Sequence, residues 1–278
     1  MRFLLITVTD LSPESRANLE LLLESLAKQR VDGDMVLVVR GEGAAPALTP
    51  PPFQLHPLRV PHKISLSAAR NAALALARTR GLLDAADAVG FPDDDCAYPD
   101  GLLSRVATHL DILHQDIICG PYAPSGTLVD RLRFPERNQS LSPMAVMNMV
   151  SSNNVFLTAA AVRAIGDFDE RLGLGARYGA SEDSDYVLRG LDLGFRGSYL
   201  GGGDEVLVLH PYKPARPGQY YVGNVAVLAI HARSPGGLVR LLRRLAVGLA
   251  RTAQRQISSR DYLEAVLSAG RLLSSRPR

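Results

Sequence analysis

The chain has 278 residues, of which 46% are hydrophobic, so it is long enough to bury the core of one large α/β domain or two small ones. Its 31 basic and 28 acidic residues leave a formal net charge of +3, which excludes the strong basic excess of a general nucleic-acid binder. The two cysteines, Cys96 and Cys119, are too few for a disulfide framework or a cysteine-rich zinc site, and they favour a reducing, cytoplasmic location.

Short apolar runs alternate with helical patterns in the first part of the chain. A strand is expected at 4–8, where the run meets polar residues at once and shows no signal-peptide cleavage pattern. A helix with leucines at 19, 22, 23 and 26 follows, then a strand at 35–39, a proline-rich loop at 46–57, a helix at 65–80 and a strand at 88–91. No run of about 18 or more apolar residues occurs, so no membrane-spanning helix is predicted.

The second part continues the alternation and then changes character. We expect a helix at 102–113, a strand at 116–119, an irregular segment at 127–143, a strand at 153–157, helices at 159–165 and 181–193, and a strand at 206–209. After three prolines at 211, 214 and 217, leucines at 238, 241, 242, 245 and 249 interleave with arginines at 240, 243, 244 and 251. This last pattern predicts a basic amphipathic helix.

Three adjacent aspartates follow the strand expected at 88–91. Asp93 and Asp95 point to the same side of an extended stretch, at the strand end where open α/β sheets bind ligands. Paired carboxylates hold hard divalent ions such as Mg²⁺ or Mn²⁺, commonly together with substrate phosphates. The triplet therefore predicts a metal that bridges a diphosphate, and an exposed acidic turn is the alternative.

A second acidic cluster opens the helix expected at 181–193. Acidic residues in a first helical turn are favoured by the helix dipole and by capping, so a well-formed N-terminus is the simpler interpretation. The functional interpretation is a general base, a carboxylate that takes a proton from an attacking hydroxyl.

Two other places combine polar residues with apolar elements. His210 follows the last expected strand, where its imidazole is either a further metal ligand or a hydrogen-bonded structural residue. Arg70 and Asn71 form a polar pair on an otherwise apolar helix. The guanidinium of Arg70 can reach a phosphate or a base, and an ion pair within the fold is the alternative.

Six motifs, taken together and in order, resemble the family 2 glycosyltransferases of the GT-A fold. They are SAARNAAL at 67–74, FPDDD at 91–95, NNVFL at 153–157, IGDFDERL at 165–172, EDSDY at 182–186, and His210. Each motif is weak alone, but order and spacing match from about residue 3 to 212. The resemblance implies an α/β fold with a mixed, mainly parallel, Rossmann-like sheet flanked by helices. It implies a catalytic domain at 1–215, with a nucleotide-sugar half to about 120 and an acceptor half beyond, before a helical extension at 216–278.

The resemblance also implies roles for single residues. Asp93 and Asp95 correspond to the DxD motif that holds a divalent cation, Mn²⁺ or Mg²⁺, and the donor diphosphate, with Asp95 favoured as direct ligand and His210 as a further one. Asp183 matches the catalytic base, and Glu182 orients the acceptor. Residues expected to contact the nucleoside-diphosphate sugar are Thr9, Asp10, Arg40, Arg70, Asn71, Asp93 and Asp94. Residues expected to contact the acceptor are Asn153, Asn154 and Asp185.

Family members are inverting, which implies one in-line displacement without a covalent intermediate. Two turns depart from the family pattern: Thr9 and Asp10 stand where relatives often have an Asn, and Arg40 begins a turn that is often Asp-rich. Because these turns usually contact the nucleotide base, thymidine and guanosine diphosphosugars stay open beside uridine ones. The expected acceptor is a saccharide or a lipid-linked saccharide in surface polysaccharide or glycolipid synthesis, by analogy alone. The loops at 127–149 and 173–180 are expected to shape its site.

The basic helix has three interpretations. It packs its leucines on its own domain, or residues 236–256 lie peripherally on the anionic inner face of the membrane, or they form a homodimer contact. Two other functions stay open. A sugar-phosphate nucleotidyltransferase typically has a Gly-rich, basic loop after the first strand, where this chain has LSPE at 11–14. A non-enzymatic metal or sugar-nucleotide binding module at the membrane would have no use for Asp183.

Overall fold

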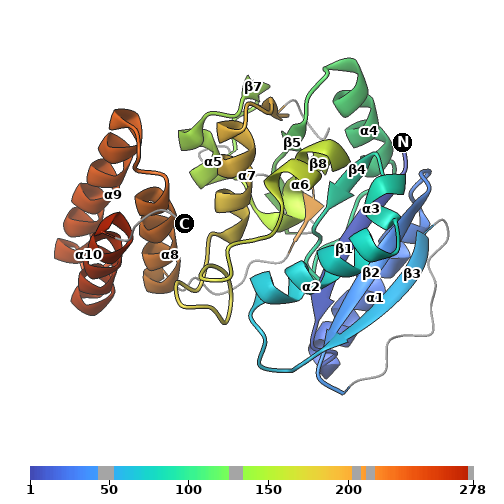
Figure 1. The fold of residues 1–278 in the computed structure, drawn as a ribbon, viewed down its shortest axis with the longest axis horizontal. Helices are drawn as coiled ribbons and strands as arrows, with labels where there is room; N and C mark the ends of the chain where they lie inside the picture. Colours follow the sequence, from blue (N-terminus) through green and yellow to red (C-terminus); the bar gives the residue numbers. More distant parts are fainter. Residues whose placement is uncertain (43–52, 125–133, 202–207, 211–216, 275–278) are drawn as a thin grey trace. The chain divides into compact units, whose positions relative to one another are not determined.

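The computed structural model describes residues 1–42, 53–124, 134–201, 208–210 and 217–274 (Figure 1). The chain forms two compact units. Unit 1 comprises Met1–Ile64, Ala68–Asp167 and Arg189–Tyr212, and unit 2 comprises Ser65–Ser67, Phe168–Leu188 and Lys213–Arg278. The domain boundary predicted at 215 falls outside the described residues and stays a prediction. The two units differ from it, because the segment Phe168–Leu188 groups with the C-terminal helices.

Unit 1 is built on an eight-stranded mixed sheet with the order β3-β2-β1-β4-β8-β5-β9-β7. The strands are β1 Phe3–Thr9, β2 Gly33–Arg40, β3 Phe53–Val60, β4 Ala88–Gly90, β5 Ile117–Cys119, β7 Gln139–Ser140, β8 Val155–Thr158 and β9 Gly197–Tyr199. Strands β1, β2, β3 and β4 run parallel to one another, and β5 is parallel to β9. Strand β8 is antiparallel to both β4 and β5, and β7 is antiparallel to β9. This architecture confirms the predicted α/β class with a mixed, mainly parallel sheet.

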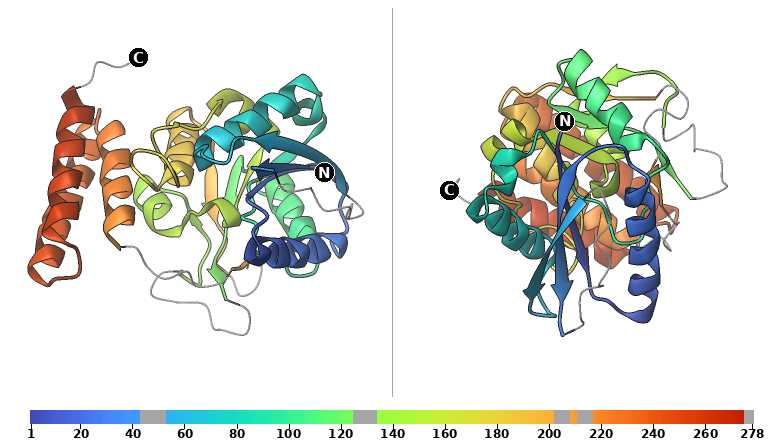
Figure 2. Two further views of the ribbon diagram at one scale, coloured as in Figure 1. Left: turned by 90° about the horizontal axis from the view of Figure 1, so that it is seen from below. Right: turned by 90° about the vertical axis from the view of Figure 1, so that its right-hand side faces the viewer.

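Strand β1 lies in the core of unit 1, and its alternate side chains point to opposite faces of the sheet. Every residue of β1 is buried, as expected for a strand covered on both faces. Phe3 and Leu5 share one apolar cluster with the leucines of α1 (Pro13–Ala27) and α4 (Leu102–Ile112). Figure 2 shows α1 and α2 (Leu66–Thr79) on opposite faces of the sheet. The remaining helices of this part are α3 Leu82–Ala85, α5 Pro143–Met149 and α6 Ala159–Ile165.

The strand β3 corrects the loop predicted at 46–57, of which residues 46–52 lie outside the described part. Its proline, Pro57, lies opposite Leu37 of β2. Strand β3 is at the end of the sheet and pairs only with β2 among the described residues. Proline lacks a backbone N–H, so it is tolerated in an edge strand, where one side of the backbone has no partner. Pro57 is therefore compatible with a strand at the edge of the sheet.

One further prediction near the site needs correction, and another is confirmed for the residues that the structure describes. The strand expected at 153–157 begins only at Val155, because Asn153 and Asn154 lie in a 3-10 turn, η1 (Ser152–Asn154). The side chain of Asn154 accepts a hydrogen bond from the backbone N–H of Ser151, and such local bonds compete with strand pairing. The strand expected at 206–209 is described as β10 (Val208–Leu209), and it pairs with β6 (Tyr122–Ala123) in a separate two-stranded sheet.

Unit 2 contains the start of α7 (Glu182–Asp192) and three C-terminal helices, α8 (Pro217–Ile230), α9 (Pro235–Ala253) and α10 (Ser259–Ser274). The three helices pack against one another, as Figures 1 and 2 show. The predicted C-terminal helical extension is confirmed, although the sequence pattern singled out only α9 within it. Within the described part of the chain, no helix is both long enough and apolar enough to cross a membrane.

Candidate functional site

Asp93, Asp95 and His210 come together in unit 1 as a group able to hold a metal ion. One ligand atom from each lies within 4.8 Å of the others. The imidazole Nε2 of His210 is 3.3 Å from Oδ1 of Asp95 and 3.8 Å from Oδ2 of Asp93. Two carboxylates and one imidazole form a donor set that suits Mn²⁺ or Mg²⁺, and these spacings match ligands that share one ion at about 2.1 Å. The residues present therefore fit the cation that the sequence predicts.

Backbone pairing explains how His210 reaches the aspartates across more than a hundred residues of sequence. Asp93 follows β4, the strand beside β1, and Ala97 forms an isolated antiparallel bridge with Leu209. The bridge hydrogen bonds run both ways, from Ala97 N–H to Leu209 O at 2.8 Å and from Leu209 N–H to Ala97 O at 3.0 Å. His210 thus lies beside the aspartate turn although β10 does not join the main sheet.

Asp93 is oriented by two donors on its Oδ1. The hydroxyl of Ser152 donates to it at 3.1 Å, and Nη2 of the buried Arg70 lies 3.3 Å from it. Such contacts fix the second oxygen of a carboxylate and so orient the first toward a ligand. The ion pair within the fold, one of the two interpretations of Arg70, is present, and contact with a donor stays a prediction. Ser152 was not singled out from the sequence.

The thiol of Cys96, next to the aspartates, does not compete with them as a soft metal ligand. Burial raises the pKa of the Cys96 thiol well above its usual value, and the charges of Asp93, Asp95 and Asp94 raise it further. Cys96 therefore stays a protonated, buried side chain at neutral pH. Burial likewise raises the pKa of Tyr98 well above its usual value. The group consequently offers hard oxygen ligands and an imidazole.

Three of the residues predicted to contact the donor, Thr9, Asp10 and Arg40, lie at the ends of β1 and β2. These strands are parallel, with Thr9 opposite Val39, so Asp10 and Arg40 leave the sheet at one edge. The backbone N–H of Ser12 donates to Asp10 at 3.0 Å and lowers the pKa of its carboxyl, and the charge of Arg40 adds to this. Thr9 is buried, and its hydroxyl accepts a hydrogen bond from the N–H of Leu11.

The two asparagines of η1 differ in their partners. The amide of Asn154 donates to the carbonyls of Gly120 and Met149, at 2.5 and 2.9 Å, so it is used within the fold. Asn153 is equally buried, but both polar atoms of its amide lack a hydrogen-bond partner among the described residues. A buried amide without partners costs free energy, so Asn153 is the better candidate for a ligand contact.

The second acidic cluster forms the first turn of α7, in unit 2. Glu182 and Asp185 are buried, at 8% and 1% exposure, and only Asp183 is partly open to solvent. The Oδ1 of Asp183 accepts a hydrogen bond from the N–H of Ser184 at 2.6 Å. Ser181, which precedes the turn, has a left-handed φ of 69°, a strained conformation that recurs at functional sites. Asp183 is thus the carboxylate of this turn that can meet a ligand.

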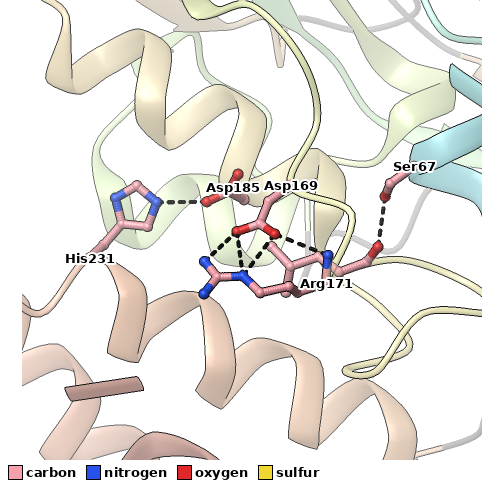
Figure 3. A network of polar contacts seen from close by, with 6 residues as sticks. Ser67, Asp169, Arg171, Asp185 and His231 are labelled. Carbon is pink, nitrogen blue, oxygen red and sulfur yellow. Dashed lines mark hydrogen bonds and ion pairs between the residues drawn. The ribbon is translucent and has the colours of Figure 1, made fainter. Parts of the chain in front are cut away.

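Asp185 takes part in a polar network that Figure 3 shows. Its Oδ1 lies 3.0 Å from Nε2 of His231, just beyond α8, and a carboxylate can only accept, so Nε2 carries the proton. Nearby, Arg171 donates to Asp169, which raises the pKa of the guanidinium, and the hydroxyl of Ser67 donates to the Leu172 carbonyl at 2.6 Å. Asp185 thus has a partner within the fold, and its predicted contact with the acceptor stays a prediction.

Helix α8 also supports the residues just before α7. The side chain of Gln219 donates to the carbonyl of Gly179 at 3.1 Å. A Cβ at Gly223 would come within 2.8 Å of the Ala180 carbonyl oxygen, so only glycine allows this close approach. The acidic turn is therefore held by the C-terminal helices through three contacts, the third being His231 with Asp185. His231 lies outside the motifs and could not be found from them.

Replacing His231 by Ala is expected to destabilise the protein by about 2–4 kcal/mol, because it removes a hydrogen-bond donor from a buried carboxylate. His231→Gln, which keeps an N–H, should cost less. In a double-mutant cycle with Asp185→Asn, the two losses should not add, since the double variant buries a neutral amide instead of a charge. Urea unfolding of the four proteins measures this. Additive losses would contradict the pairing.

A scan against protein families finds no match, and no curated protein matches the sequence. Solved structures do match. TarS from S. aureus, as residues 1–349 in complex with UDP-GlcNAc, has a TM-score of 0.68 and 17% identity over 100% of this chain and 82% of that one. The mannosyltransferase PcManGT from Pyrobaculum calidifontis, in complex with GDP-Man and Mn²⁺, has a TM-score of 0.61 and 15% identity over 99% and 76%.

The chain has the GT-A fold, as its motifs predict. The order of its sheet and its likeness to these two structures both support this assignment. At such identities the likeness concerns the fold alone. A longer TarS structure, with a TM-score of 0.59 and 17% identity, is matched over 88% of this chain but only 43% of its own length. This chain thus spans less than half of that protein.

Proposed function

We propose that the chain is an inverting, metal-dependent glycosyltransferase that moves a sugar from a nucleoside-diphosphate donor to a hydroxyl acceptor. The single observation that carries the proposal is the Asp93, Asp95 and His210 group at the end of β4 in a GT-A fold. Matching structures hold UDP-GlcNAc in one case, and GDP-Man with Mn²⁺ in another. Both support a nucleotide-sugar donor here and leave uridine and guanosine open.

The predicted metal and donor residues of unit 1 would each have a part in donor binding. Asp95 and His210 would hold Mn²⁺ or Mg²⁺ together with Asp93, which Ser152 and Arg70 keep oriented. The bound cation would supply positive charge to a leaving diphosphate. Asp10 and Arg40, at the ends of β1 and β2, would face the nucleoside, while Asp94 and Asn71 complete the predicted donor contacts.

Asp183 would act as the general base. An acceptor hydroxyl attacks the anomeric carbon and gives its proton to the Asp183 carboxylate, while the bond from that carbon to the diphosphate breaks and the configuration inverts. The partial exposure of Asp183 supports this assignment over its two buried neighbours. Glu182 would orient the acceptor, and the unpartnered amide of Asn153 would bind a sugar hydroxyl. The acceptor class we propose is a saccharide or lipid-linked saccharide, used in the cytoplasm or at the inner face of the membrane.

A thermal-shift screen of nucleoside diphosphates and their sugars, with and without Mn²⁺, tests the donor site. We expect one nucleotide series to raise Tm by several degrees only when Mn²⁺ is present, since ligands that bind the folded state stabilise it. The responding series names the base. Absence of any shift in folded protein would overturn the donor site. A shift with nucleoside triphosphates alone would favour a nucleotidyltransferase, and binding without turnover would favour a non-enzymatic module.

A further inference from the structure

Helix α9 uses only one narrow face to pack within unit 2. Gly237, Leu241 and Gly248 are its buried residues. Tyr221 of α8 leaves no room for a side chain at Gly248, and its hydroxyl donates to the carbonyl of Arg244 at 3.3 Å. One of the three interpretations of the leucine pattern has the whole stripe packing on the protein, but Leu241 is the leucine of the stripe that is fully buried. The packing interpretation therefore accounts for only part of the helix.

The neighbouring face of α9 is apolar and exposed. Leu238, Leu242 and Leu249 are 42%, 56% and 58% exposed. They recur at intervals of four and seven residues, so they share one face, with Ala246 and Ala253 between and beyond them. Val239 is exposed at the margin of this face. We call these six residues the apolar face of α9. A continuous exposed apolar face of this kind marks a binding surface.

The charge around this face is of one sign. Residues 231–260 contain seven arginines and no acidic residue. Because the whole chain carries +3, all other residues together carry −4. The arginines are Arg233, Arg240, Arg243, Arg244, Arg251, Arg255 and Arg260. Helix α10 differs, since its exposed Leu263 has acidic neighbours at Asp261 and Glu264. The combination of apolar face and positive charge therefore distinguishes α9 from α10.

We propose that α9 lies in the interface of an anionic lipid bilayer, with its apolar face in the acyl region and its arginines against lipid phosphates. An apolar face on one side of a helix and an arginine-rich polar face on the other is the composition of interfacial helices. Anionic lipids complement the charge of the segment. A second copy of the chain fits this surface less well, because two such faces would bring the arginines of both copies together. The surface is independent of the proposed transfer reaction.

Sedimentation of the full chain with lipid vesicles tests the surface. We expect binding to vesicles of phosphatidylglycerol and phosphatidylcholine, a steep loss of binding with added salt, and no binding to phosphatidylcholine alone. The triple variant Arg240→Gln, Arg243→Gln, Arg251→Gln should weaken partitioning about 100-fold. Its control is Arg16→Gln, Lys28→Gln, Arg30→Gln, which removes the same charge from exposed positions of unit 1 and should leave binding within about twofold of wild type.

A second pair of variants isolates the apolar contribution. Leu242→Glu should reduce partitioning at least about tenfold, and Leu21→Glu, at an equally exposed position of α1, should not. Circular dichroism melts of every variant must match wild type for the comparison to count. Absence of binding by wild type, or equal loss in test and control variants, would overturn the proposal. A dimer seen by light scattering and abolished by Leu242→Glu would assign the face to a second copy instead. Failure of the nucleotide screen would leave this result untouched.

Discussion

Asp183→Asn is expected to lower kcat about 10²- to 10⁴-fold while donor binding stays unchanged. A general base contributes on this scale, because the acceptor oxygen must lose its proton as it attacks. The asparagine keeps the size of the side chain, and its oxygen can still accept the hydrogen bond from the Ser184 N–H, so the turn should keep its shape. Kinetics with the donor found in the screen, together with the thermal shift that this donor produces, measure both quantities.

Asp192→Asn supplies the matched control. It makes the same chemical change on the same helix, at an exposed position in the last turn, and should leave kcat within about twofold of wild type. Equal activity of Asp183→Asn and wild type would remove Asp183 from the reaction. A loss of the donor-induced shift in Asp183→Asn would mean that the residue serves binding rather than proton transfer.

Asp95→Ala should abolish the Mn²⁺-dependent stabilisation by nucleotide and lower kcat/KM at least about 100-fold. Residues that merely support metal ligands cost 10- to 100-fold when changed, and Asp95 contributes a ligand atom itself. The variant leaves His210 and Asp93 in place, so any weak residual metal binding reports on those two. Thermal shift with a Mn²⁺ titration and steady-state kinetics give the two readouts.

The control for this change is Asp100→Ala, an exposed acidic residue five positions further along the same segment. It should keep the full response to Mn²⁺. A wild-type response in Asp95→Ala would show that the cation binds elsewhere and would remove the observation on which the proposed function rests. Loss of the response in both variants would point to a general effect of negative charge instead.

The sequence predicted the apolar strands well, including the strand that leads directly into the acidic site residues. Strand β1 is a continuous apolar run because both its faces are covered, and β4 leads directly into Asp93. His210 was predicted as a further metal ligand, and the structure brings its imidazole close to both aspartates through β10, which pairs with β6 and not with the main sheet. The short strands β6, β7 and β9 were missed, because two or three residues are too few to show a period.

Contacts between distant segments could not be predicted. Asp185 and His231 are 46 positions apart, and no spacing rule connects a helix start with the residue after another helix. Ser152 reaches Asp93 through the 3-10 turn that replaces the predicted start of a strand. Glu182 and Asp185 are buried while Asp183 is partly exposed, a difference that the spacing of these residues does not predict. Helix α8 did carry a signal, a mostly apolar run at 220–230, which the prolines before it obscured.

Pro57 has a consequence for how the protein behaves at high concentration. An edge strand offers a row of free backbone groups onto which a strand of another molecule can add, and this is a common start of aggregation. In β3 the row is interrupted near its middle by a residue that has no N–H to donate, and Arg59 adds a charge two residues later. The edge of the sheet at β3 therefore resists pairing with a strand of another molecule. We expect this to limit aggregation of the protein at high concentration.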